Sequence, residues 1–473
     1  MINLVLSEVI EAIEGRCCGQ ASPVSVTGVS IDSRSCRGCD VFFAIRGERY
    51  DGHDFVRDAL GKGAVAAVIR AEDGPRVAAA LEQGSNGRGA ERLIEVGDPL
   101  EALGKLAAYH RKQLSANVIA VVGSNGKTTT KAMIDHLLCG RFRGRCAPKS
   151  FNNSVGVPLT LLDGEAADEY LVVEIGTNAP GEVAALAAIA EPSTAVITCI
   201  GPEHLEGLGD LDGVVREETS VLQAVRPGGF AAVNIDAPEV QSCLPTNGPT
   251  LTSFGYNSDA DVRLSDVRYE PPWTRFLLNG RFEYRLGVIG AHNAVNATAA
   301  IVVARRFGLE HEEIAERLER FSLPPMRNEI DRIGGITIIN DAYNSNPQSA
   351  VAALEVLESI PARGRRMIVF GEMRELGRHS PRLHADFARR MAEHDIDRVI
   401  LVGPAGDLMY DAMIGSGMPT LCVERRATVE ECGDYLAEEL RDGDVVLLKA
   451  SRAVGLERLL EPIRKRFEAV AMA

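Results

Sequence analysis

Residues 118–131, VIAVVGSNGKTTTK, carry the strongest single signal in the sequence. An apolar run typical of a buried strand passes into a glycine-containing turn, and Lys127 and Thr128 then begin a predicted helix. Gly123 and Gly126 allow the backbone to approach a phosphate, and the start of the helix directs unpaired N–H groups toward it. The stretch therefore predicts a strand–loop–helix unit that binds the phosphates of a nucleotide.

The residue types in this loop suggest specific contacts. Lys127 would neutralise β- and γ-phosphate charge, and Thr128 would offer its hydroxyl to a bound Mg²⁺. The loop is not the standard eight-residue form, because Val121 stands five residues before Gly126 where that form has glycine. A strand–turn–helix corner without a ligand is the alternative. The predicted nucleotide-binding residues of the loop are Gly123, Ser124, Asn125, Gly126, Lys127, Thr128 and Thr129.

Outward from this loop, apolar runs alternate with helical stretches, as in α/β proteins with buried parallel strands. A polar, alternating stretch at 261–286 predicts an antiparallel extension, and the Ala-rich stretch 291–308 predicts a long helix. Pro324 and Pro325 mark a break, after which further apolar runs predict another α/β unit. A chain of 473 residues exceeds one ordinary core, so we expect three domains, at 1–99, 100–322 and 323–473.

The composition excludes several classes of protein. With 45% hydrophobic and 25% charged residues, the chain is typical of soluble globular proteins. Its net charge of -15 argues against general nucleic-acid binding, which needs a basic face. No apolar run approaches the roughly 20 residues of a membrane span, and Glu8, Glu11 and Glu14 interrupt the N-terminal apolar stretch as no signal peptide would allow. We expect a cytoplasmic monomer.

The ten cysteines are expected to be reduced thiols. Cys36 and Cys39, or the adjacent Cys17 and Cys18, are the alternative as zinc ligands. No second cysteine pair or histidine pair at ligand spacing completes such a site, so the sequence favours thiols without metal.

The GxxGKTT form of the loop resembles the ATP loop of the Mur ligases and of their relatives, the folylpolyglutamate synthases. Taken singly, the other similar segments have ordinary explanations, such as a solvated strand-end carboxylate or a helix cap at Asn293. Their order along the whole chain favours the resemblance. These segments are SFNNSVGVPLT (150–160), EIGTNAPGEV (174–183), GPEHLEGLGDLDGV (201–214), AHNAVNA (291–297), PPMRNEI (324–330), IINDAYNSNPQS (338–349), GEMRELG (371–377) and LLKASRAVGLE (447–457).

The resemblance implies a three-domain α/β architecture. An N-terminal domain would bind a UDP-muramoyl peptide, a central parallel-sheet domain would bind ATP, and a C-terminal Rossmann-like domain would bind the acceptor amine. The implied further nucleotide contacts are Asn293, Asn296, Arg327 and Asp341. The implied catalytic residues are Lys127, Glu174, His204, Glu218 and Arg327, and the implied Mg²⁺ ligands are Thr128, Glu174, His204 and Glu218.

The segments resemble most the branch of the family that adds D-alanyl-D-alanine to UDP-N-acetylmuramoyl-tripeptide. EHLEGLG, DAYNSNP and GEMRELG fit that branch, and the DNPR-type motif of the third-residue-adding ligases is missing. The implied substrate contacts are Ser33, Arg34, Arg46, Gly47, Asn152, Tyr343, Asn344, Asn346, Lys449, Ser451 and Arg452. Another amide ligase of the superfamily, or a nucleotide-binding relative without catalysis, remains the alternative; the folylpolyglutamate synthases lack the N-terminal domain.

Glu218 marks a departure from the family. Counting from His204, Mur ligases usually have a lysine here, which CO₂ converts to a carbamate. Glutamate supplies an anionic oxygen on a shorter arm, so we expect Glu218 to replace the carbamate as a metal ligand. A solvated position on a helix surface is the alternative.

Overall fold

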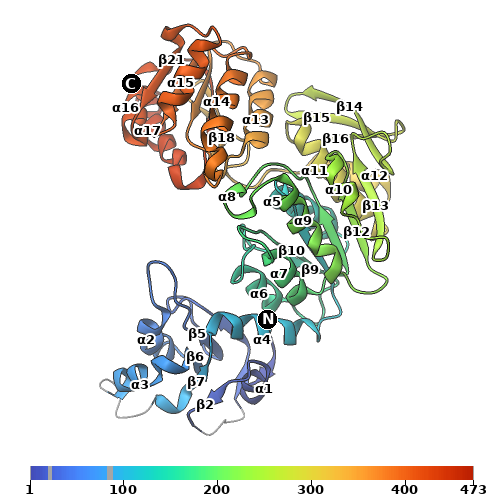
Figure 1. The fold of residues 1–473 in the computed structure, drawn as a ribbon, viewed down its shortest axis with the longest axis vertical. Coiled ribbons are helices and arrows are strands. Elements are labelled where there is room, and N and C mark those ends of the chain that lie inside the picture. Colours follow the sequence, from blue (N-terminus) through green and yellow to red (C-terminus); the bar gives the residue numbers. More distant parts are fainter. Residues whose placement is uncertain (1, 20–23, 83–88, 472–473) are drawn as a thin grey trace.

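The computed structural model describes residues 2–19, 24–82 and 89–471. Three large sheets follow one another along the chain, and each has its own covering helices (Figure 1). The N-terminal region lies at one end of the molecule, the C-terminal region at the other, and the central region joins them. The predicted three-domain α/β architecture is therefore confirmed. Within the described ranges, no helix has both the length and the apolarity that crossing a bilayer requires.

The N-terminal region contains a five-stranded sheet in the order β2-β7-β6-β5-β4, parallel except for β2. Apolar side chains alternate between its two faces: Phe42 packs under the helices of this region, whereas Phe43 faces a core shared with the central region. The elements are β1 (Leu4–Val5), α1 (Leu6–Ala12), β2 (Arg16–Cys17), β3 (Ser25–Val26), β4 (Gly28–Ser30), β5 (Asp40–Phe43), α2 (Val56–Gly61), β6 (Ala66–Arg70), α3 (Gly74–Glu82) and β7 (Leu93–Val96).

A nine-stranded sheet in the order β16-β15-β14-β13-β12-β11-β8-β10-β9 forms the central region. In this order, the seven strands from β14 through β8 to β9 pair in parallel. Strands β14, β15 and β16 form the predicted antiparallel extension. The strands are β8 (Asn117–Val122), β9 (Gly144–Cys146), β10 (Tyr170–Glu174), β11 (Thr194–Ile197), β12 (Phe230–Asn234), β13 (Thr250–Gly255), β14 (Val262–Glu270), β15 (Trp273–Leu278) and β16 (Phe282–Leu286).

Helices cover both faces of the central sheet. α5 and α11 pack on one face, and α4, α6, α7 and α9 pack on the other. α4 begins where Asp98 caps the N–H groups of Leu100 and Glu101 and Pro99 occupies the first turn. The helices are α4 (Pro99–Arg111), α5 (Lys127–Leu138), α6 (Gly156–Asp163), α7 (Glu182–Ala190), α8 (Leu205–Leu208), α9 (Leu211–Thr219), α10 (Pro238–Ser242), α11 (Ala291–Arg306) and α12 (His311–Leu318).

The C-terminal region has a six-stranded sheet in the order β17-β18-β22-β19-β20-β21, in which β17 is antiparallel to its neighbour. Helices α13 to α15 cover one face, and α16 and α17 cover the other. The elements are β17 (Glu329–Ile333), β18 (Ile336–Asp341), α13 (Pro347–Ser359), β19 (Arg366–Phe370), α14 (Ser380–Met391), β20 (Arg398–Val402), α15 (Gly406–Gly415), β21 (Val423–Arg426), α16 (Val429–Glu439), β22 (Val445–Lys449) and α17 (Leu460–Ala471).

Candidate active site

A cavity of about 1390 Å³ lies between the central and C-terminal regions. Its central wall is formed by loops at the carboxyl ends of parallel strands β8, β10, β11 and β12, where ligands of open α/β sheets bind. Its other wall comes from the loop after β18 and from helices α13 and α14. Ligand pockets usually measure roughly 300–1,000 Å³, so this cavity has room for a nucleotide and part of a second substrate.

The loop after β8 requires its two glycines. Gly123 has φ +126°, and a Cβ there would lie 2.3 Å from the hydroxyl of Thr198. Gly126 has φ +84°, and a Cβ there would lie 2.1 Å from the amide oxygen of Asn296. Helix α5 then begins at Lys127, as the sequence predicts. The backbone therefore stays close to its neighbours and leaves the first N–H groups of α5 facing the cavity.

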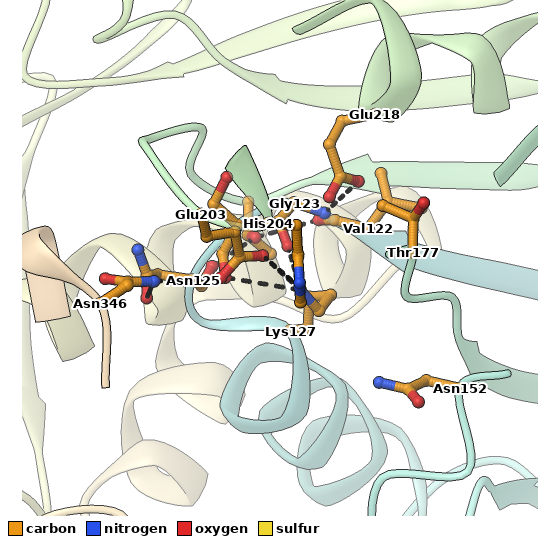
Figure 2. Close-up of polar contacts among 12 residues, drawn as sticks. Val122, Gly123, Asn125, Lys127, Asn152, Thr177, Glu203, His204, Glu218 and Asn346 are labelled. Atoms are coloured by element: carbon orange, nitrogen blue, oxygen red, sulfur yellow. Dashed lines mark hydrogen bonds and ion pairs between the residues drawn. The ribbon is translucent and has the colours of Figure 1, made fainter. Parts of the chain in front are cut away.

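Lys127 stands among three carboxylates. Its Nζ lies 3.2 Å from Oε1 of Glu203 and donates to the carbonyl oxygens of Gly123 and Ser124 (Figure 2). Burial by itself lowers the pKa of Lys127, but Glu203, Glu218 and Glu174 together raise the pKa above its usual value. The side chain therefore remains a cation, as phosphate binding requires.

Glu174, at the end of β10, has one oxygen that suits a cation. Its Oε1 accepts hydrogen bonds from Thr128 Oγ1 at 3.2 Å and Asn152 Nδ2 at 3.1 Å. Its buried Oε2 has no hydrogen-bond partner, and the Nζ of Lys131 is 3.2 Å away. A hard divalent cation prefers such carboxylate and hydroxyl oxygens. Thr128 and Glu174 therefore fit a Mg²⁺ ion.

The other two predicted Mg²⁺ ligands, His204 and Glu218, do not converge with Glu174 on one metal position. Among residues 2–19, 24–82 and 89–471, no three His, Cys, Asp or Glu side chains converge as a metal site. The Nδ1 of His204 lies 2.5 Å from Oε2 of Glu375, which belongs to the C-terminal region. Burial lowers the pKa of His204, but the carboxylates of Glu375 and Glu203 raise it overall.

Glu218 lies inside the protein. It is 1% exposed on α9, and its Oε2 accepts a hydrogen bond of 2.8 Å from the backbone N–H of Gly123 (Figure 2). Burial is the main cause that raises the pKa of Glu218 to about 7, and Lys127 opposes the rise. The alternative of a solvated helix residue is wrong, because the side chain is buried and bonds to the backbone of residues 123–129, the phosphate loop.

Two of the predicted nucleotide contacts, Asn293 and Asn296, are buried at the start of α11. Asn293 donates to the carbonyl oxygen of Ile289 at 2.8 Å, and Asn296 lies against Gly126. Asn293 does not cap the helix, because α11 begins at Ala291 and Asn293 lies in its first turn. Both residues line the cavity.

The segment that links the two regions directs Arg327 back to the phosphate loop. The Nη2 of Arg327 donates to Thr128 Oγ1 at 2.8 Å, and its guanidinium lies 4.4 Å from the ring centroid of Tyr343. Met326 and Asn328, on either side, have φ values of 61° and 50°. These two left-handed residues, one on each side of Arg327, bend the backbone so that the Arg327 side chain enters the cavity.

Asp341 ends β18 and faces the cavity, but Lys449 lies behind it. The Oδ2 of Asp341 is 2.6 Å from Lys449 Nζ, and its Oδ1 accepts from the backbone N–H of Asn328 at 3.1 Å. Lys449 is only 2% exposed and also donates to the carbonyl oxygen of Asn344. The geometry gives Lys449 a role in orienting Asp341, and Lys449 also lines the cavity, as a substrate contact must.

The start of α13 contacts the phosphate loop directly. Asn346 caps α13 and also donates to Asn125 Oδ1 at 2.8 Å and to Glu203 Oε2 at 3.0 Å (Figure 2). The Nδ2 of Asn125 donates to Gln348 Oε1 at 3.0 Å. Glu203 and Gln348 are site residues that the sequence did not predict. A charged residue in the loop after β11, directly before His204, was the available signal for Glu203.

Several predicted substrate residues lie outside this cavity. Ser451 is buried and accepts from the N–H of Arg374, and Arg452 is exposed beside Glu457. Four predicted residues belong to the N-terminal region and do not line this cavity: Ser33, Arg34, Arg46 and Gly47. Asn152, Tyr343, Asn344, Asn346 and Lys449 do line the cavity.

Comparison with known proteins identifies the family. Profiles described as Mur ligase family, catalytic domain, Mur ligase middle domain, and Mur ligase, glutamate ligase domain match residues 25–111, 121–304 and 326–452. The UDP-N-acetylmuramoyl-tripeptide--D-alanyl-D-alanine ligase of Bacillus subtilis (strain 168) is 33% identical over 470 residues, which cover 98% of this chain and 99% of the relative.

Solved structures agree. MurF from Acinetobacter baumannii superposes with a TM-score of 0.85 at 27% identity, covering 98% of this chain and 99% of that one. MurF ligase from Thermotoga maritima in complex with ADP superposes with a TM-score of 0.80 at 28% identity, covering 94% and 99%. The predicted resemblance is confirmed by sequence and by structure, and the chain belongs to the Mur ligase family.

Proposed function

We infer that this protein is an ATP-dependent ligase that joins D-alanyl-D-alanine to UDP-N-acetylmuramoyl-tripeptide. The observation that carries the inference is the meeting of two half-sites across one cavity. The central region provides the phosphate loop with Lys127, and the C-terminal region provides Arg327 and Asp341. Relatives that match nearly the whole chain are named for this reaction.

The reaction has two covalent steps. A carboxylate oxygen of the tripeptide attacks the γ-phosphorus of ATP, the bond to the ADP oxygen breaks, and an acyl phosphate forms. The amine of D-alanyl-D-alanine then attacks the acyl carbon, gives up a proton, and phosphate leaves with both electrons of the C–O bond. Both steps bring anions together, so cations around the phosphates stabilise the transition states.

The described residues suit these needs. Lys127 and Arg327 would contact phosphate oxygens, Asp341 would accept hydrogen bonds from the ribose hydroxyls, and Asn293 and Asn296 would flank the adenine. Closure of the C-terminal region over the cavity would exclude water from the acyl phosphate.

Mg²⁺, when bound, offsets the negative charge of the phosphates. Thr128 and Glu174 would hold it through oxygen atoms that already lie together. We propose that His204 and the carboxylate of Glu218 complete the set, with Glu218 in the role that a carbamylated lysine has in relatives. Their present partners, Glu375 and the N–H of Gly123, would have to be exchanged.

The remaining parts of the proposal concern the other regions. Residues 1–99 would bind the UDP-muramoyl peptide through Ser33, Arg34, Arg46 and Gly47, residues 100–322 would bind ATP, and residues 323–473 would bind the acceptor amine. One chain supplies both walls of the cavity, which supports action as a monomer. The use of ATP supports action in the cytoplasm.

The test is a screen of ADP release. The protein is mixed with ATP, Mg²⁺ and UDP-muramoyl tripeptide, and the amine is D-alanyl-D-alanine, lysine, diaminopimelate or glutamate. We expect ADP release that requires both the tripeptide and D-alanyl-D-alanine. Faster release with a single amino acid would contradict the assigned amine, and ADP binding without release under any condition would favour a nucleotide-binding regulator.

A further inference from the structure

Glu203 occupies the junction between the phosphate loop and the C-terminal region. It is 5% exposed, directly precedes His204 in the loop after β11, and divides its two oxygens between two partners. Its Oε1 lies 3.2 Å from Lys127 Nζ, and its Oε2 accepts from Asn346 Nδ2 at 3.0 Å (Figure 2). This carboxylate therefore contacts the main cation of the site and the cap of α13 at once.

The contacts of Lys127 imply that Glu203 competes with phosphate. An ammonium group has three donors, and Lys127 directs them to the carbonyl oxygens of Gly123 and Ser124 and to Glu203. The two carbonyl groups belong to the backbone of the loop. A phosphate oxygen that takes a donor from Lys127 therefore replaces Glu203 most readily, because only Glu203 is a side chain and only it is an anion.

Glu203 still has polar contacts after a phosphate oxygen has replaced it at Lys127. Asn346 remains bonded to its Oε2, and His204 Nε2 lies 3.5 Å from its Oε1. Asn346 also contacts Asn125 of the phosphate loop. The carboxylate thus stays in place beside the triphosphate, where it repels the phosphates and attracts a cation bound to them.

We infer that Glu203 is a positioning residue that holds Lys127 and yields it to the triphosphate, and that it thereby makes nucleotide affinity depend on a divalent cation. The inference rests on the use of ATP in the proposed function and not on the identity of the amine. Glu203 would weaken binding of free ATP, and it would weaken binding of ATP with Mg²⁺ much less, because the cation offsets its charge.

The experiment measures ATP affinity by titration calorimetry, with EDTA and then with excess Mg²⁺. The variant is Glu203→Gln, which keeps the size of the side chain and one acceptor oxygen for Asn346 but removes the charge. The matched control is Glu206→Gln, three residues further along the chain in α8, where the side chain is exposed. Glu203→Ala removes the same charge with a smaller side chain, in case the amide disturbs folding.

In EDTA, we expect Glu203→Gln to bind ATP about tenfold more tightly than the parent, as removal of one nearby anion implies. With excess Mg²⁺ the gain should fall to about threefold or less, and Glu206→Gln should match the parent in both conditions. Glu203→Ala should reproduce the gain in EDTA.

Two results would overturn the inference alone. One is equal affinity of the parent and both Glu203 variants in EDTA. The other is an equal loss of affinity in EDTA and in Mg²⁺, which a purely structural role would produce. A parent protein that binds no ATP in either condition would overturn the proposed function and this inference together.

Discussion

Two clusters of charge in this protein are built in opposite ways. The N-terminal charge cluster consists of Arg46, Asp51, His53, Asp73 and Arg76. Arg46 bridges both aspartates at 3.2 Å, and Arg76 contacts both as well. Burial would raise the pKa of Asp51, yet hydrogen bonds from His53 and Arg46 bring that pKa down to about 2. Each carboxylate has a cation, so the cluster is satisfied by its own members.

The phosphate-loop cluster has the opposite balance. Glu174, Glu203 and Glu218 surround Lys127, and the pKa of Glu218 is raised to about 7. Lys131 pairs with Glu174 and Lys127 pairs with Glu203, whereas Glu218 accepts from the backbone N–H of Gly123. A buried carboxylate of this kind is costly unless a cation or ligand completes the group. The first cluster therefore stabilises the local structure of the N-terminal region, whereas the charged groups of the second remain available to bind the reactants.

Removal of Lys127 should have the largest effect, because it takes away the cation on which the second cluster depends. Lys127→Ala should lower kcat/KM for ligation by roughly 10³-fold or more, since it removes charge stabilisation from the transferred phosphoryl group. Steady-state ADP release measures the loss. Lys112→Ala, an exposed lysine just after α4, is the matched control. Near-parental activity with normal ATP affinity would show that Lys127 does not act on phosphate.

Loss of the charge on Glu218 should have an intermediate effect. Glu218→Gln keeps the shape of the side chain, and we expect turnover to fall on the order of tenfold to a hundredfold. Removal of bicarbonate should not affect the parent, because a glutamate needs no CO₂ to provide its carboxyl group. Glu218→Lys should be poor in CO₂-free buffer and should recover when bicarbonate is added. Parental turnover of Glu218→Gln would exclude Glu218 from the metal site.

The same variant should also change how stability depends on pH. The pKa of Glu218 is raised to about 7 in the folded protein from an ordinary value of 4.5, so the folded state keeps a proton that the unfolded chain releases. The stability that this proton provides is complete below pH 4.5 and is lost as pH rises through 7. Glu218→Gln should therefore match the parent near pH 4.5 and exceed its stability at pH 8 by about 1–3 kcal/mol. Thermal and urea unfolding at both pH values measure the difference.

A change in the N-terminal charge cluster should have the smallest effect on catalysis. His53 is buried; its Nε2 accepts from the N–H of Arg70 at 3.0 Å, so its Nδ1 donates to Asp51 at 2.6 Å. His53→Asn can keep the donor but loses the acceptor. We expect a loss of about 1–3 kcal/mol in stability, the cost of one unsatisfied buried group. The KM for the UDP-linked substrate should rise by roughly threefold with kcat almost unchanged, since the displaced Arg46 lies far from the reacting atoms.

His53→Gln supplies the comparison, because its longer amide can reach the N–H of Arg70 but not Asp51 in the same geometry. A fall in kcat at unchanged KM in either variant would contradict the separation of the two clusters. A kcat that falls by the same factor by which KM rises would indicate that the N-terminal region also affects phosphoryl transfer.

The sequence alone determined the features that depend on neighbouring residues. β8 is an unbroken apolar run, Gly123 and Gly126 make the turn, and Lys127 begins α5, so the phosphate loop followed from local rules. The antiparallel strands at 262–286 followed from alternating polarity in the same way. Short edge strands such as β9 were not predicted, because three residues carry too little pattern.

The contacts between charged side chains from distant parts of the chain depend on the tertiary structure. Arg327 reaches Thr128 across 199 residues of sequence, and Lys449 lies behind Asp341 because β22 pairs with β18. The sequence left a solvated helix position open as the alternative for Glu218, yet α9 packs this side chain against the phosphate loop. Contacts of this kind depend on how domains and strands pack, since burial and partner charge set the energy of an ionised group. Residue type and spacing fix neither quantity.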